Sequence, residues 1–165
     1  MMVFHGAVLS VGELIERAKA DHSTRPAIRD DRAVLHTAAS NAAHCARLLS
    51  QGGTLDDVWR FCVLQTLDDY TSTLRRGGIS LASKVFEQEP APTGSHEVDA
   101  ALAALAEHLA HHDGWDTPAW VQDPSRTTVW YPDLIEQERQ EATDTAPPAF
   151  RRRGVFITPR ALWRA

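Results

Sequence analysis

The sequence predicts an all-α, single-domain helical bundle that ends in an irregular region rich in aromatic and proline residues. Apolar residues recur at helical spacing in several stretches, and capping residues and glycines mark where those stretches begin and end. With 165 residues, 43% of them hydrophobic and 24% charged, the chain has the length and composition of one globular domain. We expect helices over residues 1–94, then one helix and an arginine- and aromatic-rich segment over residues 95–165.

The first part of the chain predicts two helices. Residues 11–20 open with Ser10 and Glu13 at capping-box spacing. Residues 27–51 form the second helix, which ends at a glycine pair. Most residues of its inward face are small, which lets a neighbouring helix approach closely. That face consists of Leu35, Ala38, Ala39, Ala42, Ala46 and Leu49.

The third predicted helix runs from its cap at Thr54 to the glycine pair Gly77 and Gly78. Its apolar face is wide, and Phe61 and Leu64 add apolar positions on the opposite side. A helix that is apolar nearly all round either lies at the centre of a fold or is covered by a partner. The sequence leaves open whether Phe61 and Leu64 face a core or an interface.

The second half predicts one long helix and several short elements. Residues 89–94 are typical of a stiff surface loop, and Ser95 then caps a helix that runs to His112 or Asp113. Beyond Trp115, prolines and aromatic residues predict short turns held by side-chain packing. The elements expected there are a helix over 133–143, a short helix within 147–154, an extended step over 155–157 and a last turn from residue 158.

The charge distribution is more informative than the net charge. A net charge of −5 and a pI near 5.9 do not favour nucleic-acid binding by the surface as a whole. Residues 132–146 hold five acidic residues and one arginine, whereas residues 150–165 hold five arginines and no acid.

No apolar run reaches about 18 residues, and the N-terminus lacks a signal-peptide pattern, so we expect a cytoplasmic protein.

Three histidines near the end of the long predicted helix are candidate metal ligands. His108, His111 and His112 have spacings that bring imidazoles together, but no His-Glu-x-x-His pattern and no distant third ligand accompany them. A histidine-rich helix end, stabilised by the helix dipole, is the favoured interpretation.

Cys45 and Cys62 are expected to be reduced, buried residues. No nucleophile motif or phosphate-binding loop is present, so the sequence favours a non-enzymatic protein without a cofactor.

The arginine- and aromatic-rich C-terminus is the strongest candidate for a binding site. Three interpretations remain open: stacking and phosphate contacts with nucleic acid, docking on an acidic protein partner, and internal pairing with the acidic 133–144 helix. The candidate partner-binding residues are Phe150, Arg151, Arg152, Arg153, Val155, Phe156 and Ile157.

Three segments carry a family resemblance: residues 101–110, residues 118–121 and residues 148–157. Over about residues 95–165 the chain resembles a group of small, uncharacterised helical proteins of high-GC bacteria. Members of that group look like the partners encoded beside nucleotidyltransferase-type toxins. The resemblance implies an antitoxin-like protein that binds and masks such a toxin. It supplies no catalytic residues, and its matching positions lie within 150–157.

The function predicted from the sequence is therefore a non-enzymatic protein-binding module with a nucleotidyltransferase-type partner. In this hypothesis Arg151, Arg152 and Arg153 contact the partner, and changing all three to glutamate leaves the fold nearly intact. A DNA-binding transcriptional regulator is the first alternative, although Asp56 and Asp57 would face phosphates badly at the start of their helix. A metal-dependent helical-bundle enzyme is the second. No membrane partner is expected.

Overall fold

The computed structural model describes residues 10–13, 15–16 and 33–163. The chain divides into two units, residues 1–31 and residues 32–165, and each is described by itself. In the first unit, residues 11–13 and 15–16 are helical. The predicted capping box is confirmed, because the Ser10 N–H donates to the Glu13 carboxylate at 2.8 Å and the Glu13 N–H donates to Ser10 Oγ at 3.3 Å. Residues 17–20 of the predicted helix lie outside the described residues.

The second unit is all-helical, as predicted. Within residues 33–163 the chain forms seven α-helices, short π and 3₁₀ turns, one isolated β-bridge and no strand. None of the helices in the described residues is long and apolar enough to cross a membrane. The elements are α2 (Ala38–Ser50), α3 (Leu55–Val58), the π-helical turn η1 (Trp59–Leu64), α4 (Gln65–Gly77), α5 (Ile79–Ala82), the 3₁₀ turn η2 (Ser83–Phe86), α6 (His96–Asp113), the 3₁₀ turn η3 (Ala119–Gln122), α7 (Glu136–Thr145), α8 (Pro148–Arg152) and the 3₁₀ turn η4 (Pro159–Leu162).

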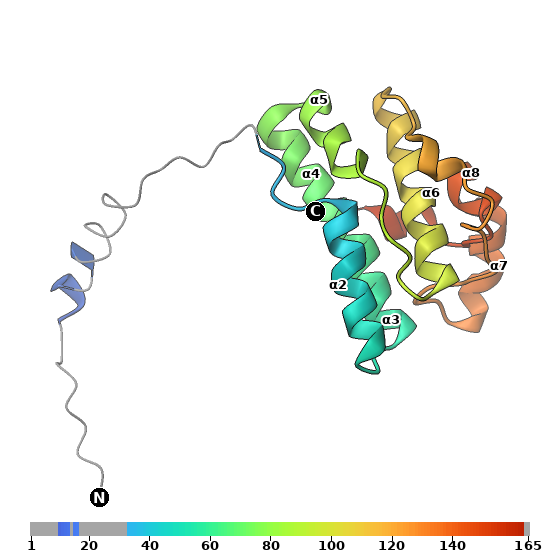
Figure 1. Cartoon of the computed structure of the whole chain (residues 1–165). Coiled ribbons are helices and arrows are strands. Elements are labelled where there is room, and N and C mark those ends of the chain that lie inside the picture. The colour runs from blue at the N-terminus through green and yellow to red at the C-terminus, as the bar shows by residue number, and fades with distance from the viewer. Residues whose placement is uncertain (1–9, 14, 17–32, 164–165) are drawn as a thin grey trace, which may run out of the picture. The chain divides into compact units, whose positions relative to one another are not determined.

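Helix α6 is the centre of this unit. It runs between the layer formed by α2, α4 and α5 and the C-terminal helices α7 and α8 (Figure 1). Its predicted limits are confirmed: Ser95 caps its start, and Gly114 ends it in the left-handed conformation. Eleven of its residues are buried, and ten of these are alanine, valine or leucine. The alanines let η1, η3 and α8 pack closely around it.

The predicted helix over 54–77 is one continuous helical run with a π-helical turn inside it. The Thr54 cap and the stop at Gly78 are confirmed. At η1 the Gln65 N–H reaches the carbonyl oxygen of Arg60, five residues earlier, which inserts one extra residue into the helix. Trp59 points inward from this turn and is 2% exposed, whereas Phe61 is 56% exposed. This run therefore packs on the core along one side only.

Two sequence expectations about the first half need correction. The second helix begins at Ala38 rather than residue 27, because Thr37 and Ser40 form a capping box there. Residues 27–32 lie outside the described residues, and Leu35 is exposed ahead of the helix. The loop over 89–94 is not purely a surface loop, since Pro90 and Thr93 are buried in it. In addition, α5 and η2 were not predicted, because four residues are too few to show a helical period.

The C-terminal elements lie close to where they were expected. Helix α7 begins at Glu136, three residues later than predicted, because Asp133 has a positive φ of 51° that no α-helix accepts. The extended step at 155–157 is confirmed by a parallel bridge between Trp130 and Val155. The Trp130 N–H donates to the Gly154 carbonyl at 2.8 Å, on one side of that bridge. Cys45 and Cys62 are buried free thiols.

We predict that Gly154→Ala destabilises the protein by about 3 kcal/mol or more. Gly154 has φ 72°, and a Cβ there would collide with the backbone carbonyl of Thr128. Gly78→Ala is the matched control, because Gly78 has φ 71° and open space around its Cα. The control isolates the cost of the left-handed backbone, about 1 kcal/mol. Urea unfolding measures both, and equal losses would contradict the role of the close approach to Thr128.

Candidate functional site

The predicted arginine segment meets a buried carboxylate on α6. Glu107 is 6% exposed and follows the buried, apolar stretch 100–106 of the helix. Its carboxylate accepts a hydrogen bond from Arg153 at 2.9 Å and a second, close one from Arg152. The Arg153 side chain is also buried, whereas that of Arg152 is half exposed. The segment is therefore anchored in the interior by the ion pair between α6 and the end of α8.

The other arginines of this region contact α7. Arg151 donates to the carbonyl oxygen of Asp144 at 2.6 Å, and Arg160 forms an ion pair with Glu141 at 2.8 Å. These two contacts agree with internal pairing against the acidic helix. The partner of Arg152 and Arg153 was missed from the sequence. The available signal was an acidic residue at position 107, directly after the alanine- and leucine-rich stretch 100–106 of the helix.

The remaining predicted partner-binding residues are mostly inside the protein. Phe150, Val155 and Ile157 are fully buried in the core, and Phe156 is half buried against the ring of Tyr131 at 4.9 Å. Arg151, Arg152 and part of Phe156 are the members that reach the surface. The structure changes what we expect of the triple change to glutamate: it should disrupt the fold, because glutamate at 153 would face Glu107 in a buried site.

The three candidate histidines do not converge on one point. His108 is half buried beside the ring of Phe150, and burial, then the positive charge of His112, lowers its pKa. His111 and His112 are exposed, and His112 Nδ1 lies 2.8 Å from an oxygen of Asp113. Among the described residues, no group of three or more histidine, cysteine or acidic side chains is placed to hold a metal ion.

A groove of about 830 Å³ lies between α5 and η2 on one side and the chain from Gly114 to Trp120 on the other. Sequence reasoning did not find it, because its walls come from segments about thirty residues apart in the chain. We call it the tryptophan groove. It is lined by Ile79, Ser80, Ser83, Lys84, Glu87, Glu89, Gly114, Trp115, Asp116, Pro118, Ala119 and Trp120.

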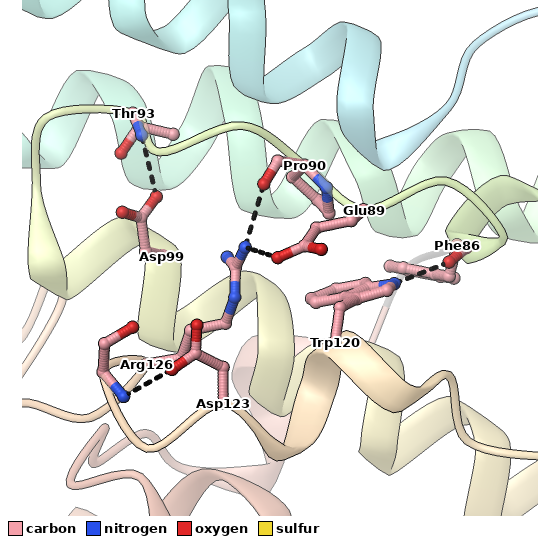
Figure 2. Close-up of polar contacts among 9 residues, drawn as sticks. Phe86, Glu89, Pro90, Thr93, Asp99, Trp120, Asp123 and Arg126 are labelled. Carbon is pink, nitrogen blue, oxygen red and sulfur yellow. Dashed lines mark hydrogen bonds and ion pairs between the residues drawn. The ribbon is translucent and has the colours of Figure 1, made fainter.

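Trp120 is fixed in the groove wall by two contacts. Its indole N–H donates to the carbonyl oxygen of Phe86 at 3.0 Å, and the guanidinium carbon of Arg126 lies 5.0 Å from its ring centroid (Figure 2). Arg126 is itself 4% exposed and donates to the Pro90 carbonyl at 2.9 Å and to Glu89 at 3.2 Å. These bonds hold the chain at 86–90 against η3, which gives the groove a rigid end.

Trp115 is fixed in a similar way at the other end. Its indole N–H donates to the Tyr70 hydroxyl at 2.9 Å, and Tyr70 donates to Asp113 at 2.5 Å. The ring of Trp115 is stacked on that of Phe86, with centroids 5.9 Å apart and an interplanar angle of 18°. Burial, then the hydrogen bond to Asp113, raises the pKa of Tyr70, so this hydroxyl stays protonated and keeps donating.

A second hollow, of about 480 Å³, lies on the outer side of the π-helical turn. It is lined by Arg60, Phe61, Leu64, Gln65, Asp68 and Asp133. We call these six residues the Phe61 surface. Arg60 and Asp133 form an ion pair at 3.2 Å across it, which joins segments 73 residues apart. The structure thus answers the question left by the sequence: Phe61 faces outward, and Leu64 is half buried against the core.

Comparison of the chain with protein-family models, with curated proteins and with solved structures gives no match.

We predict that Arg153→Gln destabilises the protein far more than Arg152→Gln. Both side chains contact the same carboxylate, but Arg153 is buried and Arg152 is half exposed. Removing a buried partner costs about 3 kcal/mol or more, whereas a half-exposed partner contributes about 1 kcal/mol or less. Urea unfolding at neutral pH measures the two losses. Equal losses would show that burial of the pair does not control its contribution.

We further predict a pH dependence that Glu107 causes. Burial works to raise its pKa, but hydrogen bonds from Arg152 and Arg153 hold it below the ordinary value of 4.5. Because the folded pKa is the lower one, the pair's contribution is present above about pH 4.5 and is lost as the pH falls through the folded pKa. The difference in unfolding free energy between the wild type and Glu107→Gln should shrink below pH 4.5. A constant difference down to about pH 3 would contradict this.

Proposed function

We propose that this chain is a non-enzymatic, antitoxin-like protein-binding module, and that its partner docks on the Phe61 surface. The observation that carries the proposal is the exposure of Phe61, 56% of which is open to solvent beside a hollow in the surface. Large aromatic side chains that stand beside a concavity are typical anchors of protein interfaces. The function predicted from the sequence is kept, but its site moves away from the arginine segment.

The local backbone supports a functional role for this surface. A π-helical turn inside an α-helix is rare and frequently lies at a functional site. Asp133, on the other side of the hollow, is the one non-glycine residue with positive φ in the described part of the chain. Such a conformation costs about 1–3 kcal/mol and persists where the surroundings hold it. At this position the Asp133 side chain pairs with Arg60 at 3.2 Å across the hollow.

The charge of the surface indicates the chemistry of the partner. The hollow is lined by the carboxylates of Asp68 and Asp133 and by one arginine, Arg60, which pairs with Asp133. Asp56 and Asp57 in the first turn of α3 add negative charge just before the π-helical turn. A partner segment that carries apolar side chains for Phe61 and lysine or arginine for the carboxylates complements this surface. The same carboxylates oppose the binding of DNA.

The family resemblance supplies the first partner to test, a nucleotidyltransferase-type protein encoded by a neighbouring gene. In the proposed arrangement the module would mask that protein by covering an apolar, basic region of its surface. Arg151 and Arg152 reach the surface elsewhere on the chain and remain available for a secondary contact. Binding of nucleic acid, with a steep salt dependence, is the outcome expected of a transcriptional regulator instead.

We predict that Phe61→Ala weakens binding of the co-expressed neighbouring nucleotidyltransferase-type protein by about 30-fold or more. Trp163→Ala is the matched control, since Trp163 is a 75% exposed aromatic residue that does not line this hollow. Isothermal titration calorimetry of the purified pair gives both dissociation constants, and thermal unfolding checks that each variant is folded. A Phe61→Ala variant that binds as tightly as the wild type would refute the site. Absence of any complex, together with salt-sensitive DNA binding, would refute the function.

A further inference from the structure

We infer that the tryptophan groove binds a small organic cation: an ammonium, amidinium or guanidinium group on a flat apolar body. The groove shares no lining residue with the Phe61 surface, so the inference stands independently of the proposed function. Its volume of about 830 Å³ falls within the range of small-molecule sites in proteins, about 300–1,000 Å³.

The first argument is that the two tryptophans offer the groove only their apolar ring surface. The indole N–H is the one polar group of tryptophan, and in both residues it is already used inside the protein. Trp115 donates to Tyr70, and Trp120 donates to the carbonyl oxygen of Phe86. The half-buried ring of Trp115 therefore offers a ligand contact area and ring surface but no hydrogen bond, whereas Trp120, which is 8% exposed, adds only the accessible edge of its ring. Flat or cationic groups gain most from such a wall.

The second argument is that the wall is already in place before a ligand binds. Trp115 is stacked on Phe86, and Trp120 is packed beneath Arg126, so neither ring has to be ordered on binding. Holding the side chains beforehand removes a cost of about 0.5–1.5 kcal/mol for each side chain that would otherwise be immobilised. Arg126 itself is 4% exposed, and its hydrogen bonds to Pro90 and Glu89 hold it on the inner side of the wall (Figure 2).

The third argument is the sign of the charge around the tryptophans. Glu87, Glu89 and Asp116 line the groove against a single cation, Lys84. Glu89 is paired with Arg126, but no ion pair or side-chain hydrogen bond engages Glu87 or Asp116 within the described residues. Two carboxylates beside an aromatic wall form the arrangement that recognises organic cations. An anionic ligand would meet three carboxylates and one ammonium, and a neutral ligand would leave Glu87 and Asp116 unused.

The test is a titration of the full chain with benzamidine, which is a flat cation at neutral pH, and with benzamide, its neutral isostere. Isothermal titration calorimetry gives the affinities, and the NMR signals of the tryptophan indole N–H groups report the place of binding. We expect benzamidine to bind about tenfold more tightly than benzamide and to shift two indole signals. Equal affinities, or no saturable binding of benzamidine, would overturn the inference.

Matched variants connect the binding to the groove. Glu87→Gln with Asp116→Asn should weaken benzamidine binding about tenfold and leave benzamide binding unchanged. Asp56→Asn with Glu136→Gln removes the same two charges from exposed positions outside the groove and should have less than about a twofold effect. Equal losses in the two double variants would show a general charge effect and overturn the site. Binding of an arginine-containing peptide without binding of benzamidine would also overturn it, in favour of a docking groove for a polypeptide.

Discussion

The pairing of Glu107 with Arg153 and Arg152 constrains the rest of the C-terminal half. Glu107 lies in the most deeply buried helix, where an unpaired carboxylate would be very costly. Its partners are 45 and 46 residues away in the chain, at the end of α8. The pair therefore fixes where α8 lies along α6. Gly154 then turns the chain, and Val155 forms a bridge to Trp130. Phe150 before this turn and Ile157 after it are both buried in the core.

Several arginines form their contacts inside the protein, whereas acidic side chains stay at the surface. Arg126 and Arg153 are buried, and Arg152 is held at the edge of the interior. Each of them neutralises a carboxylate or supports an aromatic ring inside the protein. Acidic side chains such as Glu87 and Asp116 stay at the surface without an internal cation. The tryptophan groove and the Phe61 surface are both lined by more carboxylates than cations.

These two regions suit different ligands because their apolar parts differ. In the groove, two tryptophans line the wall, and hydrogen bonds of their indole N–H groups hold both rings in place. On the Phe61 surface, a single phenyl ring stands out from a π-helical turn, and in the proposed function a partner protein covers it. A fixed wall with nearby carboxylates favours a small cation, whereas a protruding ring favours insertion into a partner protein.

Short-range patterns were enough to predict the helical class and most helix limits. Thr54, Ser95 and the glycines at 78 and 114 act within one turn of their own helix, so their effect is visible in the sequence. The pairing of Glu107 with Arg153, the burial of Phe150 and the walls of the groove depend on segments brought together by folding. Side-chain type cannot reveal such partners, because arginine pairs as readily with one carboxylate as with another. The sequence left open whether Phe61 faces a core or an interface, and only the tertiary structure excludes the core, because the π-helical turn packs Trp59 inward and leaves Phe61 exposed.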